Sequence, residues 1–169
     1  RCPDGTTLVS ASSDRTVRIW DLTDGCLYQW GLRTPESFCK SEAQTISFSP
    51  DNQFVVTAEY SKVFIRKVNN GDVVKCLYGH NDCVRGATFN PSGDHVVTCS
   101  DDMTLIIWDA ETGEVSHILR GHEDGVTFVA YSPNGKQIVS ASSDKTVKGW
   151  DSKTGALIRT IDGFEDVVM

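Results

Sequence analysis

The sequence has no apolar run that approaches the roughly 20 residues of a membrane-spanning helix. Its opening stretch, Arg1-Cys2-Pro3-Asp4-Gly5, is also unlike the charged and then apolar segment of a secretory signal. We therefore expect a chain without a membrane segment. At 169 residues it is long enough for one compact domain and too short for two large ones.

Positive charge is scarce. The chain carries 16 Lys and Arg against 23 Asp and Glu, which gives a formal net charge of −7. Proteins that bind nucleic acid present basic patches to the phosphate backbone, so this balance disfavours a nucleic-acid partner. Motifs for cofactors are missing as well, since there is no glycine-rich phosphate loop, no H-E-x-x-H metal motif and no nucleophile elbow. We expect no cofactor and no metal.

Cysteine pairs of the C-x-x-C kind are absent, although the chain has six cysteines. A disulfide framework is typical of much shorter secreted chains, so free thiols in a reducing compartment are expected. Cys76, His80 and Cys83 have a roughly metal-like spacing, and zinc is the alternative interpretation. It is disfavoured because no fourth ligand is visible nearby and because His80 belongs to a recurring Gly-His pair. The cysteines are Cys2, Cys26, Cys39, Cys76, Cys83 and Cys99.

What the sequence does contain is an internal repeat. The segment over residues 79–120 is followed by a second segment that matches it position by position. His80 and His122 are 42 residues apart, and so are Trp108 and Trp150. A fixed period of this size is the signature of a repeat architecture.

Each period holds short runs rich in β-branched residues, such as Val96-Val97 and Leu105-Ile106-Ile107, which favour strands. Turn formers separate these runs, among them Asn90-Pro91-Ser92-Gly93 and Glu111-Thr112-Gly113. The pattern predicts four short antiparallel strands per period. A sheet this small cannot bury both of its faces alone, so it must stack on copies of itself.

Alternation along the strand that ends at Trp108 predicts two apolar faces. Trp108 and Ile106 point one way, whereas Leu105 and Ile107 point the other. Both faces are therefore suited to neighbouring sheets. Gly149 stands where Ile107 stands one period earlier, which leaves either a gap or a site of close approach.

Four pieces of the last full period carry a family resemblance: Gly121-His122, Ser132-Pro133-Asn134-Gly135, Ser143-Asp144-Lys145-Thr146 and Trp150-Asp151. Together they resemble the WD40 repeat of β-propellers. The resemblance implies an all-β fold of about four blades, each a four-stranded antiparallel sheet. Because WD40 propellers usually close with about seven blades, within a general range of roughly four to eight, it implies a partial propeller or half of a dimeric ring.

The resemblance covers nearly the whole chain, but unevenly. The first repeat begins one strand late, and a longer connection over residues 32–43 follows it. In the second repeat, Arg66 stands where Trp108 stands in the third, and no Gly-His pair precedes it. We expect a single domain over residues 1–169, with repeats at about 1–36, 37–78, 79–120 and 121–162 and the start of a further repeat at 163–169.

A serine, a histidine and an aspartate recur together, and such a set can perform nucleophilic catalysis. The resemblance implies a different use, a buried network in which an indole N–H and an imidazole both bond a hydroxyl and the imidazole also bonds a carboxylate. Thr98 replaces Ser140 in one copy, and the set occurs more than once, which favours the structural role. The expected network residues are His80, Thr98, Asp102, Trp108, His122, Ser140, Asp144, Trp150, Ser10, Asp14 and Trp20.

The resemblance implies a non-catalytic scaffold or adaptor that binds a protein or peptide, in the cytoplasm or nucleus, within a larger complex or a multidomain signalling protein. Two enzymatic alternatives stay open: a hydrolase that uses the His122 set, and a regulatory segment of an enzyme whose catalytic domain lies elsewhere. Self-association that completes a ring is a further hypothesis.

Arg and aromatic residues are favoured as contact anchors in interfaces between proteins. The candidate partner-binding residues lie at loop edges (Ser13, Asp101 and Ser143), just inside the first strands (Arg85 and Phe128) and in the second repeat (Tyr60).

Overall fold

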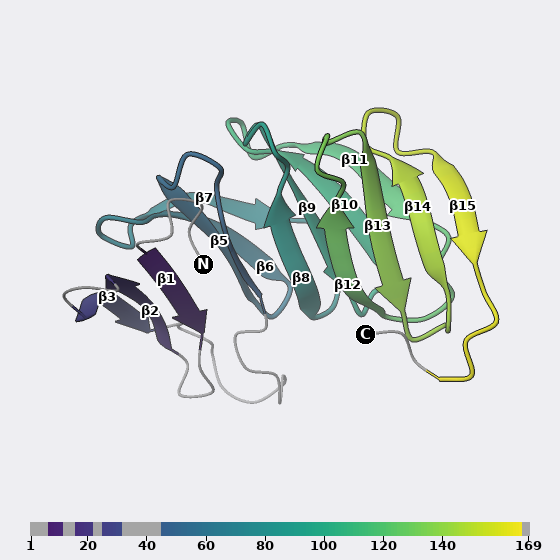
Figure 1. Ribbon diagram of the computed structural model, residues 1–169, viewed down its shortest axis with the longest axis horizontal. Helices are drawn as coiled ribbons and strands as arrows, with labels where there is room; N and C mark the ends of the chain where they lie inside the picture. The colour runs from purple at the N-terminus through teal and green to yellow at the C-terminus, as the bar shows by residue number, and fades with distance from the viewer. Residues whose placement is uncertain (1–6, 12–15, 22–24, 32–44, 167–169) are drawn as a thin grey trace.

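The computed structural model describes residues 7–11, 16–21, 25–31 and 45–166 (Figure 1). All regular structure in these residues is β-strand, arranged as four antiparallel sheets that follow one another in chain order. The described residues contain no helix, and hence none of the length and apolar character needed to cross a membrane. The predicted all-β fold of small stacked sheets is confirmed.

Three of the sheets have four strands, and the first has three within the described ranges. In every sheet, strands that are consecutive in the sequence are hydrogen-bonded neighbours. The first sheet holds β1 (Thr7–Ala11), β2 (Thr16–Asp21) and β3 (Gly25–Gly31). The second holds β4 (Ile46–Phe48), β5 (Phe54–Glu59), β6 (Lys62–Lys67) and β7 (Val73–Tyr78). The third holds β8 (Val84–Phe89), β9 (His95–Ser100), β10 (Thr104–Asp109) and β11 (Val115–Arg120). The fourth holds β12 (Val126–Tyr131), β13 (Gln137–Ser142), β14 (Val147–Asp151) and β15 (Leu157–Ile161).

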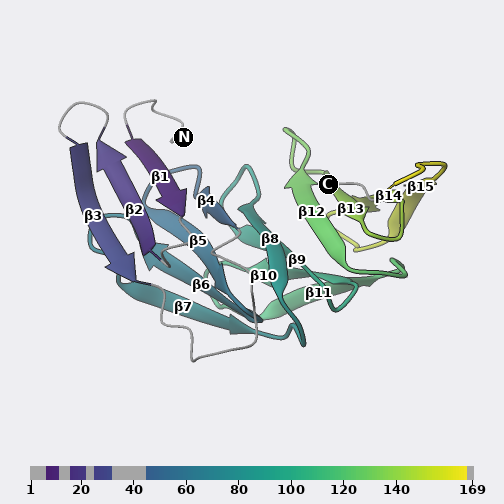
Figure 2. The same ribbon diagram turned by 90° about the horizontal axis from the view of Figure 1, so that it is seen from below.

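The sheets form an open arc of propeller blades (Figure 2). The first strands of successive blades lie side by side, because β8 contacts both β4 and β12. This arrangement is a partial propeller, as the resemblance implies.

The core lies between the sheets, and β10 contributes to both of its parts. Ile106 and Trp108 pack into a cluster with the second sheet, whereas Leu105 and Ile107 pack into a cluster with the fourth. The strand is therefore apolar on both faces, as the alternation predicts. Among the described residues, no atom beyond its chain neighbours lies within 4 Å of the position of a Cβ added to Gly149, so this position is open and is not a site of close approach.

The turns that join the third and fourth strands of the third and fourth sheets use glycine for its backbone freedom. Gly113 and Gly155 have φ of 80° and 71°, a region that residues with a Cβ seldom occupy. Each donates its N–H to the carbonyl of the aspartate that follows the tryptophan, Asp109 or Asp151, at 2.9 Å. The Thr-Gly pairs in the sequence therefore mark real reversals of the chain.

The expectation of free thiols is correct for Cys76 and Cys99 and wrong for Cys83, which is disulfide-bonded. Cysteine pairing depends on which Cβ atoms the fold brings together, and spacing along the chain cannot reveal it.

Candidate functional site

The sheets have two edges, and the recurring polar residues gather at one of them. We call this the network edge; it consists of the turns at residues 59–62, 100–103 and 142–145 and the inter-sheet loops at 79–83 and 121–125. The opposite edge, which we call the turn edge, consists of the turns at 90–94, 109–113, 132–136 and 151–155. Strands that alternate in direction place these two sets of connections at opposite ends of each sheet.

In the fourth sheet, the network edge is held by four side chains in a continuous chain of contacts. The Trp150 indole N–H donates to Ser140 Oγ at 2.9 Å. His122 Nε2 lies 2.8 Å from the same Oγ, and His122 Nδ1 lies 2.7 Å from Asp144 Oδ2. The Asp144 carboxylate also accepts the backbone N–H of Glu123 at 3.0 Å. The contacts tie the loop before β12 to the turn between β13 and β14.

The third sheet repeats this arrangement with threonine in place of serine. The Trp108 indole N–H donates to Thr98 Oγ1 at 2.9 Å. His80 Nε2 lies 2.7 Å from Thr98 Oγ1, and His80 Nδ1 lies 2.9 Å from Asp102 Oδ2. In the first sheet, Trp20 Nε1–H donates to Ser10 Oγ at 2.8 Å, and the predicted Asp14 lies outside the described residues.

Two threonines that the sequence analysis did not single out belong to these networks. Thr104 Oγ1–H donates to Asp102 Oδ1, and Thr146 Oγ1–H donates to Asp144 Oδ1, each at 2.6 Å. The signal that would have found them is the threonine two residues after each aspartate, present in both copies.

The second sheet replaces the network with a partly buried ion pair. The Arg66 guanidinium donates to Glu59 Oε1 at 2.9 Å, and both side chains are nearly covered. Thr57, on β5 at the place of Thr98, keeps a buried hydroxyl that has no hydrogen-bond partner in the part of the chain that the structure describes. Loss of the tryptophan and histidine therefore leaves the hydroxyl at the centre of the network unused.

Electrostatics fix the protonation states within the networks. Burial lowers the pKa of His80 and of His122, and it outweighs the opposite effect of the neighbouring carboxylates. Burial alone would raise the pKa of Asp144, but hydrogen bonds from Thr146, from the Glu123 amide and from His122 hold that pKa below its ordinary value. With the aspartate ionised and the histidine neutral, Nδ1–H must donate to the carboxylate, and Nε2 accepts a hydrogen bond from the Ser140 hydroxyl.

The contacts of Ser140, His122 and Asp144 have the lengths of a catalytic triad, but their burial does not suit a nucleophile. Ser140 is 0% exposed, and the His122 side chain is 0% exposed. An oxygen that attacks a substrate must be reachable by that substrate, whereas Ser140 Oγ already accepts the Trp150 indole N–H.

Four of the candidate partner-binding residues form a strip along the network edge, from the second sheet to the fourth. Arg85 donates through two guanidinium nitrogens to the Asp101 carboxylate, and the backbone carbonyl of Tyr60 accepts the N–H of Val84, next to Arg85. An added Cβ on Gly125 would lie 3.1 Å from Asp101 Oδ1. The Gly125 carbonyl accepts the Ser143 N–H at 2.9 Å. We call Tyr60, Arg85, Asp101 and Ser143 the edge strip.

The other two candidates do not join this strip in the structure. Phe128 is 50% exposed and lies on β12 at the place that Gly86 occupies on β8. Gly86 sits beneath Val129 of the next sheet, so Phe128 faces away from the third sheet. Ser13 lies outside the described residues.

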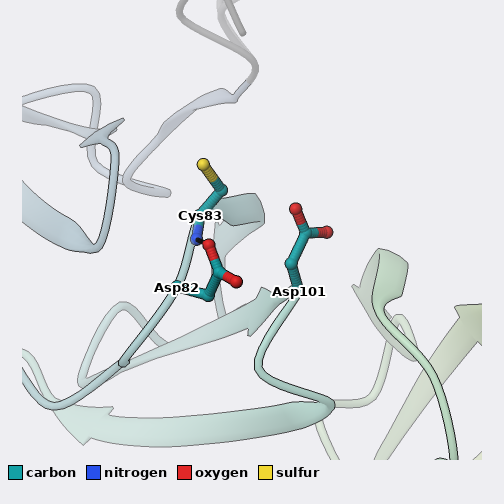
Figure 3. Close-up of side chains that lie close together, drawn as sticks. All are labelled: Asp82, Cys83 and Asp101. Carbon is teal, nitrogen blue, oxygen red and sulfur yellow. Dashed lines mark hydrogen bonds between the residues drawn. The ribbon is translucent and has the colours of Figure 1, made fainter. Parts of the chain in front are cut away.

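Within the described residues, one group of potential metal ligands comes together, namely Asp82, Cys83 and Asp101 (Figure 3). Its members are already engaged: the Cys83 sulfur is in a disulfide, Asp101 is bound by Arg85, and Asp82 Oδ1 accepts the Cys83 N–H at 2.7 Å. The zinc alternative is not supported either, because both ring nitrogens of His80 are taken by Thr98 and Asp102.

Comparison with known proteins gives consistent matches. The family model described as "WD domain, G-beta repeat" matches residues 2–21, 71–109 and 113–151, and it omits the stretch that contains Arg66. The chain is 32% identical over 108 residues to the "Uncharacterized WD repeat-containing protein sll1491" of Synechocystis, covering 63% of this chain and 30% of that protein.

Two fungal proteins are also similar. The chain is 28% identical over 125 residues to "Nuclear distribution protein PAC1-1" of Uncinocarpus reesii and 28% identical over 130 residues to "Nuclear distribution protein PAC1" of Coccidioides posadasii. Each match covers 63% of this chain but only 27% and 26% of the relative. The matched part thus spans less than a third of these relatives. The family model covers more than half of the 169 residues, and the blades it matches have the expected strands, so this chain belongs to the WD40 repeat family.

Proposed function

We propose that this chain is part of a non-catalytic scaffold whose network edge binds a protein or peptide partner. The observation that carries the proposal is the edge strip, in which Tyr60, Arg85, Asp101 and Ser143 follow one another across three sheets, Arg85 near the start of β8 and the other three in turns between strands. Tyr60 is 44% exposed, and the side chains of Arg85 and Asp101 are 32% and 28% exposed, so an aromatic residue and an arginine are both within reach of a partner, and these are the residue types favoured as contact anchors.

Rigidity of the edge supports a binding role. The networks hold the loop at 121–125 against the turn at 142–145, and the third sheet repeats the device. A surface that is already ordered loses little conformational entropy when a partner binds, so more of the contact energy appears as affinity.

The proposal is tested by exchanging the charges of the Arg85–Asp101 pair. The variant Arg85→Asp with Asp101→Arg keeps the ion pair and therefore the fold, but it reverses the charge pattern that a partner meets. We expect proteins retained by the wild type in affinity capture, and then confirmed by calorimetry with the purified partner, to bind the exchange variant at least tenfold more weakly. Tyr60→Ala should weaken the same binding. Equal binding by wild type and both variants would refute a role for the edge strip.

The hydrolase alternative has its own test. Burial of Ser140 and His122 favours a structural role, so we expect no ester hydrolysis that depends on Ser140. Turnover of p-nitrophenyl acetate is compared between wild type and Ser140→Ala at equal folded concentration. Activity in the wild type that is lost in the variant would support the hydrolase alternative.

We also propose a cytoplasmic or nuclear location, which imaging of a fluorescent fusion of the full-length protein would test.

A further inference from the structure

The turn edge contains a pocket between the third and fourth sheets, on the side of the molecule opposite the edge strip. Its volume is about 250 Å³. It is lined from the third sheet by Asn90, Asp94, His95, Ile107 and His117, and from the fourth by Tyr131, Ser152 and Lys153. We call it the seam pocket.

The boundary between the second and third sheets, which we call the neighbouring seam, has apolar residues at the positions that line the pocket between the third and fourth sheets. Phe54 begins β5 as His95 begins β9, and Phe89 ends β8 as Tyr131 ends β12. Ala110 stands where Ser152 stands, one residue after the strand. All three belong to, or pack against, the hydrophobic cluster of that seam. Three apolar residues that fill one seam are therefore polar in the next, where the structure has a pocket.

Two residues that line the seam pocket carry a polar atom without a hydrogen-bond partner among the described residues. His117 Nδ1 is buried, and no described residue forms a hydrogen bond with it. The ring is held in place by Gly155, whose added Cβ would lie 3.1 Å from His117 Cδ2. The Tyr131 hydroxyl makes no hydrogen bond within the described part of the chain, and burial, with a smaller effect of Asp94, raises the pKa of Tyr131, so it stays a donor. A buried polar group without a partner costs about 1–3 kcal/mol, so a ligand that supplies one gains affinity.

Asp94 lines the pocket and Asp151 lines the adjoining groove, and both carboxylates already accept several hydrogen bonds within their own turns. Asp94 accepts hydrogen bonds from Asn90 Nδ2 and Ser92 Oγ and lies 3.0 Å from His95 Nδ1. Asp151 accepts the backbone N–H groups of Lys153 and Thr154 and the hydroxyl of Thr154.

The groups left to meet a ligand are therefore mainly donors. These donors are the ammonium of Lys153, the hydroxyl of Tyr131 and the ammonium of Lys136. Lys136 lines a groove that adjoins the pocket and shares Ser152 and Lys153 with it. The pocket is smaller than the roughly 300–1,000 Å³ typical of sites for drug-sized ligands. It suits a single side chain, and the groove suits the extended backbone on either side of that side chain.

We propose that the seam pocket is a second binding site, which takes the carboxylate side chain of a glutamate in an extended acidic peptide lying along the groove. Lys153 and Tyr131 bind the carboxylate oxygens, and Ile107 packs against the methylene groups, next to the ring of His117. The site is separate from the edge strip, so the chain can hold two segments at once.

The probe is N-acetyl-glutamate methylamide, and its matched control is N-acetyl-glutamine methylamide, which has the same shape without the charge. In NMR titrations of protein labelled at histidine and tyrosine, we expect saturable shifts of His117 and Tyr131 with the glutamate probe and at least tenfold weaker binding of the glutamine probe. Equal responses to both probes would refute the proposal.

Two variants locate the binding. Lys153→Glu introduces the charge found at the corresponding Glu111 and, being at the surface, leaves the fold intact; we expect at least tenfold weaker binding. The triple variant His95→Phe, Tyr131→Phe, Ser152→Ala converts the seam to the composition of its neighbour, and we expect loss of the His117 response with an unchanged or higher melting temperature. Arg85→Ala, at the other edge, should leave the response intact, which separates this site from the proposed function. A response that survives both seam variants, or that disappears in Arg85→Ala, would overturn the assignment.

Discussion

Threonine hydroxyls stand at equivalent positions in two sheets of this protein, but only one of them is hydrogen-bonded among the described residues. Thr98 receives the Trp108 indole N–H and lies within hydrogen-bond distance of His80, so its oxygen is fully used. Thr57 occupies the same place in the second sheet, where Arg66 has replaced the tryptophan, and its buried oxygen has no partner. The second sheet thus has a threonine at this position but lacks the indole and the imidazole that bond the hydroxyl in the third sheet.

Replacement of each threonine by valine should therefore change the free energy of unfolding in opposite directions. Thr98→Val leaves two buried polar partners unsatisfied and should lower that free energy by about 1–3 kcal/mol for each. Thr57→Val removes an unpaired oxygen and should raise it by about 1 kcal/mol. Urea denaturation followed by tryptophan fluorescence measures both, and each variant is the control for the other. A loss of stability in Thr57→Val equal to that in Thr98→Val would show that the second sheet satisfies its hydroxyl after all.

The buried histidines make stability depend on pH. In the folded chain the pKa of His80 and of His122 lies below the ordinary value of 6.5, which the unfolded chain keeps. Below that pH the unfolded state binds more protons than the folded state, so acid favours unfolding. The stabilisation from these neutral histidines is complete above pH 6.5 and is lost as the pH falls through the folded-state pKa.

We expect the free energy of unfolding to be level above pH 7 and to fall below pH 6.5, by up to about 1.4 kcal/mol per pH unit for each histidine. Denaturation curves at a series of pH values measure the slope, and NMR titration of the two imidazole rings measures the cause. Titration of both rings at or above their ordinary pKa would contradict the assigned protonation states.

At the scale of elements, the sheets stack closely only where small residues permit it. An added Cβ on Gly86 of β8 would lie 2.9 Å from Cys99 Sγ and 3.2 Å from Val129 Cγ1 of the next sheet. Gly149 of β14 faces open space. Neither glycine has a positive φ, so their roles differ in packing alone.

Alanine at these two positions should thus give opposite results. Gly86→Ala pushes the third and fourth sheets apart and should destabilise the protein by about 1–3 kcal/mol. Gly149→Ala meets no neighbour and should stabilise β14 by about 0.5–1 kcal/mol, because a strand glycine pays more backbone entropy than alanine. Thermal melts of the two variants in one buffer decide the question, and a destabilising Gly149→Ala would mean that this face is covered in solution.

The elements were largely predictable from the sequence, because β-branched runs and turn residues recur with a fixed period. The two faces of β10 follow from alternation alone. The contacts that replace the repeat pattern were not predictable. The Glu59–Arg66 pair joins residues that no motif relates, the Cys83 disulfide depends on the folded backbone, and the seam pocket appears only when two sheets are side by side. The edge strip was partly predictable: its four residues were among the candidates chosen from the sequence, but the pairing of Arg85 with Asp101 was not foreseen.

At the scale of the whole molecule, the outer face of the fourth sheet differs from its counterpart on the third in being uncovered. Val139 and Ile161 are 41% and 44% exposed, whereas the corresponding Val97 and Leu119 are buried beneath the fourth sheet. Phe128 is exposed beside them. A face built like one that holds a blade is suited to another blade, either of a second copy or of a longer polypeptide.

The energetics limit what a second copy can gain from this face. Covering the exposed part of three such side chains stabilises a complex by about 1 kcal/mol each, whereas association costs roughly 4–15 kcal/mol. We therefore expect weak self-association, with a mass in sedimentation equilibrium that rises above one copy only at concentrations well above micromolar. Val139→Lys with Ile161→Lys should abolish the rise, while Lys145→Glu, at the network edge, should not. A constant mass of two copies at micromolar concentration would show that a larger interface than this face holds the protein together.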